Sequence, residues 1–252
     1  MKYMGSKQRI AKFIVPIIQN YIDENNITQY IEPFVGGANI IDKIECKLKI
    51  GTDLNKYLIA LLNRVKNDLP LYQDVDKNTY NLCKNYYNHK IDEPHFEDWE
   101  IGNIGFLASY NGRWFDGGYG KPVFETTKNG KRFRNYYQEA KNNLLKQAQN
   151  LFFKDCCFYC SDYENYLNLH IENTLFYVDP PYQNTTKYSN AFKFDYIRFW
   201  NWCRQMSKKN IVIISELNAP DDFKCIWEHK ANRSINVKNK SNQIEKLFVK
   251  RG

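Results

Sequence analysis

Residues 29–40 read QYIEPFVGGANI, a short apolar run followed by a pair of glycines. We interpret this stretch as a strand, a glycine turn and a helix. Gly36 and Gly37 let the backbone approach a ligand closely, because neither residue carries a Cβ. Residues 48–55, LKIGTDLN, predict a second strand that ends near Asp53, with another helix after it. This β-α-β-α order is typical of the α/β class, in which helices cover a mostly parallel sheet.

The position of Asp53 relative to the glycine turn indicates a nucleoside site. Asp53 follows Gly37 by 16 residues and falls at the end of the second predicted strand. In doubly wound sheets an acid at this point binds the ribose hydroxyls of a nucleoside cofactor. Each feature alone also fits an ordinary turn and a helix cap, but their order favours the site. The full GxGxxG pattern is missing, which favours a nucleoside without a pyrophosphate.

The α/β pattern stops in the middle of the chain and then returns. Residues 68–150 are rich in Asn, Lys and Tyr and show no clear strand alternation. Within them, Asn129-Gly130 separates two short β-forming runs, a strong signal for a hairpin. We therefore predict a catalytic domain of residues 1–67 and 151–252. Residues 68–150 would form a mainly helical insertion that carries a basic β-hairpin.

The second half of the predicted sheet leads to a short motif. A strand is predicted at residues 175–178, and DPPY follows it directly. Asp179 would lie at the carboxyl end of this strand, where ligands bind in such sheets. Pro180 and Pro181 hold the segment extended, which leaves the Pro180 carbonyl as an acceptor beside the Asp179 carboxylate. Together with the flat ring of Tyr182, these acceptors suit a planar amine. The alternative is a strand-ending turn with a surface tyrosine.

The sheet continues to the end of the chain. A helix near residues 194–208, a strand at NIVIIS and two further strands after about Lys224 are predicted, with a hairpin at the sheet edge. At the other end, residues 2–10 place Gly5 and Ser6 in a loop before a helix. Lys7 could reach a carboxylate there, and Tyr3 could stack on a ring. The alternative is a solvated N-terminus capped by Ser6.

These motifs carry a family resemblance. KYMGSKQ, EPFVGGAN, DLN and DPPY follow one another in the order of the Dam-like N6-adenine DNA methyltransferases, over nearly the whole chain. Residues 110–120, YNGRWFDGGYG, are similar to a shortened Arg- and Gly-bearing segment of that family's DNA-reading lobe. The resemblance implies a Rossmann-like, S-adenosylmethionine-dependent sheet with an inserted target-recognition lobe. It also implies site-specific methylation of adenine N6 in duplex DNA, as in restriction-modification.

The resemblance also implies roles for individual residues. The catalytic motif would be Asp179, Pro180, Pro181 and Tyr182. The residues that contact S-adenosylmethionine would be Tyr3, Lys7, Phe34, Gly36, Gly37, Asp53, Asp162 and Asp179. Ser215 matches a small residue that ends the next strand, and it can be purely structural. No metal is required.

The implied mechanism depends on the adenine amine, whose lone pair is delocalised into the ring. Asp179 and the Pro180 carbonyl would accept its two N–H groups and so localise the lone pair for attack on the methyl group. Duplex DNA hides this amine, so the base has to flip out. Tyr182 would then stack on it. Residues 183–188, with Tyr188, would close over the flipped base.

Basic residues point to the DNA side of the site. Residues 121–146 contain seven Lys or Arg against Glu125 and Glu139, a net charge of +5. A basic hairpin can enter a groove or follow phosphates. The alternative is a solvated charged hairpin. The predicted DNA-binding residues are Arg113, Lys128, Lys131, Arg132 and Arg134. Residues 230–252, with seven Lys or Arg against Glu245, fit a second phosphate contact or an exposed edge strand.

Composition limits the remaining possibilities. The formal charge of +8 and the 16% of aromatic residues suit a polyanionic partner. The seven cysteines lack framework spacing, which favours a reducing cytosol. Cys157 and Cys160 lie in a predicted strand with no second ligand pair, and the four histidines are scattered, so no metal is expected. No apolar run reaches about 18 residues, so no membrane span is expected.

Several alternatives stay open at this point. DPPY motifs also suit cytosine-N4 or RNA amino methyltransferases, and a non-catalytic DNA-binding relative would keep the same fold. We expect a monomer in the cytoplasm of a bacterium or of a phage-infected host. A partner restriction endonuclease and the recognition sequence are not determined by these residues.

Overall fold

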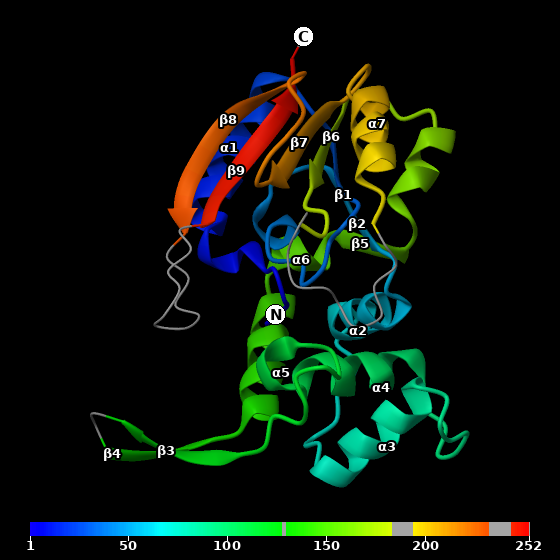
Figure 1. Ribbon diagram of the computed structural model, residues 1–252, viewed down its shortest axis with the longest axis vertical. Helices are drawn as coiled ribbons and strands as arrows, with labels where there is room; N and C mark the ends of the chain where they lie inside the picture. The colour runs from blue at the N-terminus through cyan, green and yellow to red at the C-terminus, as the bar shows by residue number, and fades with distance from the viewer. Residues whose placement is uncertain (128–129, 183–193, 232–242, 252) are drawn as a thin grey trace.

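The computed structural model of the chain describes all residues except 128–129, 183–193, 232–242 and 252 (Figure 1). A seven-stranded sheet in the order β5-β2-β1-β6-β7-β9-β8 forms the upper half of the molecule as drawn in Figure 1. Its strands are β1 (Gln29–Glu32), β2 (Leu48–Asp53), β5 (Cys156–Cys160), β6 (Thr174–Val178), β7 (Ile211–Glu216), β8 (Phe223–Ala231) and β9 (Gln243–Lys250). Strands β5, β2, β1, β6 and β7 run parallel to one another, whereas β9 is antiparallel to both β7 and β8. The predicted α/β fold class is confirmed.

Helices cover both faces of this sheet. They are α1 (Ala11–Glu24), α2 (Lys56–Lys66) and α7 (Tyr196–Met206). Tyr30 and Tyr177 are buried in the apolar cluster that contains α1 and α2, whereas Ile31 and Phe176 are buried in the cluster that contains α7. All five residues of β6 are buried. A parallel strand covered on both faces has no polar side, which explains why β6 is an unbroken apolar run.

The prediction of a helix directly after the glycine turn is wrong. The chain forms only a three-residue 3₁₀ helix there, Ile41–Lys43. Ala38 has a left-handed φ of 53°, which a helix does not allow. The Asn39 side chain donates to the Met1 carbonyl oxygen (3.2 Å) and to Ser6 Oγ (2.9 Å). These contacts hold residues 36–40 as a loop.

The residues between α2 and β5 form helices and one hairpin. They contain α3 (Lys77–Tyr87), α4 (Asp98–Gly102), a π-helical turn (Asn103–Leu107), a 3₁₀ turn (Tyr110–Gly112), β3 (Val123–Thr127), β4 (Gly130–Arg134), α5 (Tyr136–Ala148) and α6 (Leu151–Lys154). Strands β3 and β4 pair antiparallel, as the Asn-Gly signal predicted, and project away from the helices (Figure 1). The domain boundaries at residues 68 and 150 stay predictions. Within the described part of the chain, no helix combines the length and apolarity needed to cross a bilayer.

Candidate active site

The candidate site lies where the strand order reverses. Strand β1 has β2, its successor in the chain, on one side and β6 on the other. In open α/β sheets ligands bind outside the carboxyl ends of the strands at such a switch point. The glycine turn follows β1, Asp53 ends β2, and Asp179 follows β6 directly. The topology therefore brings the three predicted motifs to one edge of the sheet.

The glycine turn packs against Tyr3. Gly36 has a φ of +47°, and a Cβ on it would lie 2.9 Å from Tyr3 Cε1. A Cβ on Gly37 would lie 2.6 Å from Asn39 Nδ2 and 3.0 Å from Tyr3 Cβ. A Cβ at either position would therefore force a neighbouring side chain to move, and at Gly36 the left-handed φ favours glycine as well. Tyr3, Gly36 and Gly37, each predicted to contact the cofactor, therefore lie close together.

Asp53 is tied to the same turn. Its Oδ2 accepts a hydrogen bond from the Gly36 backbone N–H (3.2 Å), and its Oδ1 accepts one from Asn55 (3.0 Å). Burial raises the pKa of the Asp53 carboxyl, and these backbone hydrogen bonds oppose the rise. A carboxylate has about four acceptor positions, so Asp53 can still accept hydrogen bonds from ligand hydroxyls.

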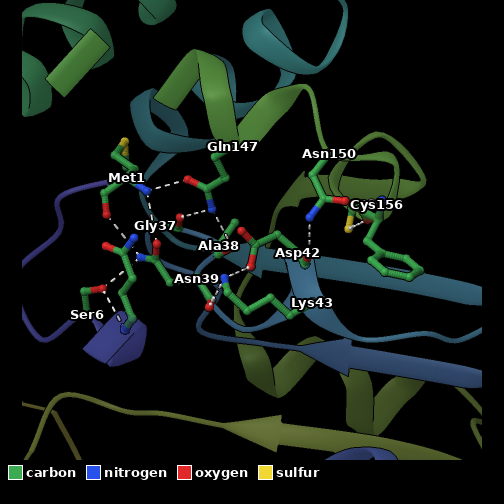
Figure 2. A network of polar contacts seen from close by, with 12 residues as sticks. Met1, Ser6, Gly37, Ala38, Asn39, Asp42, Lys43, Gln147, Asn150 and Cys156 are labelled. Atoms are coloured by element: carbon green, nitrogen blue, oxygen red, sulfur yellow. Dashed lines mark hydrogen bonds and ion pairs between the residues drawn. The ribbon is translucent and has the colours of Figure 1, made fainter. Parts of the chain in front are cut away.

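Helix α5 also holds the glycine turn, as Figure 2 shows. Gln147 Nε2 donates to the carbonyl oxygens of Gly37 (3.1 Å) and Ala38 (2.7 Å). The amino group of Met1 donates to Asn39 Oδ1 (3.0 Å) and to Gln147 Oε1. A single residue, Asn135, separates the end of β4 from the start of helix α5. The hairpin and the glycine turn are therefore joined by a single helix.

An ion pair that involves a buried lysine lies at the carboxyl end of β6. Lys7 is only 5% exposed, and its Nζ lies 2.9 Å from Asp179 Oδ1 and 3.6 Å from Glu245 Oε2. Burial raises the pKa of the Asp179 carboxyl, and the Lys7 ammonium opposes that rise. Lys7 was predicted as a cofactor contact, and the structure places it against the DPPY aspartate.

Tyr182 is anchored by its hydroxyl. This group donates to Glu245 Oε2 (2.7 Å) and lies 2.9 Å from Ser215 Oγ. The Lys7 ammonium lies 4.2 Å from the centroid of the ring, a cation–π contact. Burial, with Asp179 and Glu245 nearby, raises the pKa of Tyr182 well above its ordinary value. The phenol therefore stays protonated and able to donate.

The two prolines lie between these anchored residues. Pro180 is buried and Pro181 is exposed. The Pro181 carbonyl oxygen accepts a hydrogen bond from the Tyr196 hydroxyl at the start of α7. Helix α7 thus also holds the motif.

Two other predicted cofactor residues border the site. Phe34 packs in an aromatic cluster, with its ring centroid 5.2 Å from that of Tyr163. Asp162 caps the following 3₁₀ helix, Tyr163–Asn168. The backbone N–H of Ser161 donates to the Asp53 carbonyl oxygen (3.2 Å), so Asp162 lies beside the end of β2.

The hairpin arginines have acidic partners within the protein. Arg134 Nε lies 2.9 Å from Glu139 Oε2, and its guanidinium also reaches Glu125 Oε1 (3.1 Å). Arg132 contacts Glu139 as well (3.1 Å). Arg134 is half-buried and Arg132 is exposed. Arg134 therefore braces the hairpin against α5, whereas Arg132 presents its charge to solvent.

The remaining hairpin surface combines charge with exposed rings. Lys131 of the hairpin is exposed, as is Arg113 in the segment before β3, and Lys128 lies outside the described residues. Phe124 and Phe133 pair across the hairpin with ring centroids 5.2 Å apart, and are 76% and 57% exposed. Sequence reasoning considered only the charge of this hairpin. The alternation of Phe124 and Phe133 with charged neighbours was the signal that could have identified the apolar pair.

Two site residues were not predicted in their observed roles. Glu245 was counted only as the single acid in a basic stretch, and Ser215 as a small residue at a strand end. Both are buried and contact Tyr182. Glu245 alternates with the buried Leu247 along β9, so a carboxylate stands at a core-facing position of a strand. That position was the available signal.

Some predictions concern residues beyond those described. The loop predicted to close over the base, 183–188 with Tyr188, is outside them, as are 232–242 and 252 of the basic stretch 230–252. Within the described residues, no group of three or more His, Cys, Asp or Glu side chains could hold a metal ion.

The fold and this site define a class of protein, the Rossmann-like methyltransferases. A family model described as D12 class N6 adenine-specific DNA methyltransferase matches residues 3–242. The chain belongs to this family. The predicted enzyme class, an adenine-specific DNA methyltransferase that acts on DNA, is therefore confirmed.

Two relatives carry related names. The type II methyltransferase M.MjaIII of Methanocaldococcus jannaschii is 24% identical over 255 residues, which cover 88% of this chain and 85% of that protein. The type II methyltransferase M.FokI of Planomicrobium okeanokoites is 25% identical over 236 residues, which cover 87% of this chain and 34% of that protein. The roles of individual residues stay predictions.

Proposed function

We propose that this enzyme moves the methyl group of S-adenosylmethionine to the N6 amine of an adenine flipped out of duplex DNA. The observation that carries the proposal is the Asp179 carboxylate at the switch point of the sheet. It is largely buried, and the Lys7 ammonium lies 2.9 Å away. A carboxylate at this edge, beside a glycine turn and a second acid, suits an amine acceptor next to a nucleoside site.

The residues around the glycine turn fit a nucleoside-bearing methyl donor. Asp53 would accept hydrogen bonds from the two ribose hydroxyls, as acids at this position do in related sheets. Tyr3, Gly36 and Gly37 would surround the methionine and ribose part, with Phe34 beside them. Asp162, at the end of the neighbouring strand, would face the adenine ring of the donor. When bound, S-adenosylmethionine supplies a methyl group made electrophilic by the sulfonium charge.

The DPPY residues would activate the target amine. An ionised Asp179 and the Pro180 carbonyl would accept its two N–H groups and localise the nitrogen lone pair. This is catalysis by positioning and electrostatics, without a covalent enzyme intermediate. Lys7 would keep Asp179 ionised, and Tyr182 would supply a stacking face for the flipped base, worth about 1–3 kcal/mol.

The hairpin would contact the DNA. Lys131 and Arg132 are exposed and would lie along phosphates, where each contact adds to the salt dependence of binding. Phe124 and Phe133 would enter a groove and wedge between base pairs, as exposed apolar side chains of DNA-bending proteins do. Arg113 and Lys128 would add further phosphate contacts. Residues 68–150 would thus form the target-recognition part of the enzyme.

A methyl-transfer assay tests the proposal. Wild-type protein, Asp179→Asn and the exposed control Asp221→Asn are incubated with a radiolabelled methyl donor and mixed-sequence duplex DNA. Digestion of the DNA should yield labelled N6-methyladenine. Asp179→Asn should lose at least about 100-fold in kcat, because it removes a charged acceptor from the reacting amine, while Asp221→Asn keeps activity. Retained turnover in Asp179→Asn would overturn the assigned role.

The same assay separates the alternatives. Label on cytosine N4, or on RNA in preference to DNA, would show that adenine N6 in duplex DNA is not the substrate. DNA binding without any transfer would indicate a non-catalytic relative. The type II names of the relatives support a partner restriction endonuclease, and a DNA substrate supports a cytoplasmic location. We propose a monomer, since flipping one base requires one site.

A further inference from the structure

Glu245 is a buried carboxylate for which the proposed reaction has so far no role. It lies near the start of β9, opposite His229 of β8, and is 3% exposed. A carboxylate removed from water is costly unless charges and hydrogen bonds compensate it. Its compensating contacts include those with Lys7 and Tyr182. Both of these residues flank Asp179, so Glu245 adjoins the proposed amine site without belonging to DPPY.

Lys7 is shared between two carboxylates. Its ammonium has three donors, and three acceptors surround it: Asp179 Oδ1 at 2.9 Å, Gly5 O at 3.4 Å and Glu245 Oε2 at 3.6 Å. One buried cation therefore faces two carboxylates, of which Glu245 is buried and Asp179 is 20% exposed. Without Glu245, the attraction of Lys7 would fall on Asp179 alone.

Tyr182 depends on the same carboxylate oxygen. Its hydroxyl donates to Glu245 Oε2 at 2.7 Å, and Ser215 Oγ lies 2.9 Å from it. The ring is packed against the Lys7 ammonium at 4.2 Å. Glu245 thus fixes both the tyrosine and the lysine on either side of Asp179.

We propose that Glu245 is a positioning residue for methyl transfer. It holds Lys7 away from exclusive pairing with Asp179, so that Asp179 can accept the N–H groups of the target amine, and it orients Tyr182. The inference rests on the proposed roles of Asp179 and Tyr182. Glu245 acts through these neighbours and is not placed in contact with the base.

The test compares Glu245→Gln with Glu228→Gln, an exposed glutamate on the adjacent β8. Glutamine keeps the size of the side chain and an acceptor for Tyr182 but removes the charge. Glu245→Gln should lower kcat by about 10-fold or more, since close charge pairs in low-dielectric sites couple strongly. The KM for DNA should stay within about 3-fold, because the hairpin is untouched. Glu228→Gln should match the wild type.

A double-mutant cycle with Lys7→Met shows whether Glu245 acts through Lys7. Adding Glu245→Gln to Lys7→Met should change kcat by less than about 3-fold, because no ammonium remains to sequester Asp179. Equal losses in both backgrounds would overturn the positioning role, as would a wild-type kcat in Glu245→Gln. If Glu245→Gln alone does not fold, the charge-balanced double variant carries the test. Its kcat should equal that of Lys7→Met, and a further large loss refutes the inference.

Failure of this inference is distinguishable from failure of the proposed function. Turnover retained by Asp179→Asn would remove the amine site itself. An inactive Asp179→Asn together with a fully active Glu245→Gln would remove only the role of Glu245.

Discussion

Replacing Lys7 with methionine tests whether its ammonium keeps Asp179 ionised. The two charged atoms lie 2.9 Å apart. At an effective dielectric constant of about 20, two unit charges at this separation attract each other by about 6 kcal/mol. The cost of burying Lys7 reduces the net effect, but the remaining attraction still favours the ionised form of the Asp179 carboxyl. The substitution removes the attraction between the Lys7 ammonium and the Asp179 carboxylate and leaves a side chain of similar shape.

The direction in which the Asp179 pKa moves follows from the causes that act on it. Burial raises the pKa of Asp179, and Lys7 opposes that rise. Without Lys7 the pKa rises further, so a smaller fraction of Asp179 is ionised at any given pH. Because the amine acceptor has to be ionised, the acid limb of the rate profile should move to higher pH. Activity should recover at alkaline pH.

Single-turnover methyl transfer measures this effect directly. Enzyme in excess over duplex DNA, with saturating methyl donor, gives the rate of the chemical step from mildly acidic to alkaline pH. Lys7→Arg should keep the acid limb near that of the wild type, and Lys12→Met, an exposed lysine of α1, should leave the profile unchanged. A uniform loss at every pH, with no displacement of the limb, would refute the reasoning and favour a cofactor-binding role for Lys7.

Three further predictions concern the donor site, the turn and the hairpin. Asp53→Ala should raise the KM of the methyl donor by about 10- to 100-fold, since a charged hydrogen-bond acceptor is lost; an unchanged KM excludes the ribose contact. Gly36→Ala should lower the free energy of unfolding by about 1–3 kcal/mol, because its φ is +47° and its Cβ would lie 2.9 Å from a tyrosine ring; denaturant titration measures this. Phe124→Ala/Phe133→Ala should weaken DNA binding, measured by fluorescence anisotropy, while changing stability by less than about 0.5 kcal/mol, and Lys131→Ala should lower the salt slope by about 1; unaltered DNA affinity would exclude the hairpin from the interface.

The strands and turns that could be predicted are those with local causes. Strand β6 is an unbroken apolar run because it is buried on both faces, and Asp179 marks its end. The hairpin could be predicted because the dipeptide Asn129-Gly130 favours the tight turns that join two antiparallel strands. The glycine turn could be predicted because paired glycines allow the backbone to approach a neighbouring group closely. Tyr3 does lie close to Gly36, since a Cβ on Gly36 would be 2.9 Å from Tyr3 Cε1.

The prediction of a helix after the glycine turn was wrong because residues distant along the chain hold this segment in another conformation. Residues 38–47 contain several apolar residues at spacings that suit a helix, but Asn39 is held by Met1 and Ser6. Gln147 of α5 takes up the carbonyl oxygens of Gly37 and Ala38 that a helix would have used. Partners this distant along the chain leave no periodic pattern near the turn.

The charge balance at Asp179 could not be predicted either, because its parts come from both ends of the chain. Lys7 precedes the first strand, and Glu245 belongs to the last one. Strand β9 is antiparallel to β7, with Lys246 opposite Glu216, so the first residues of β9 lie beside the last residues of β7. The start of an antiparallel strand therefore reaches the same edge as the carboxyl ends of the parallel strands. A core-facing acid near such a start, like Glu245, is consequently as strong a candidate for a site residue as an acid that ends a parallel strand.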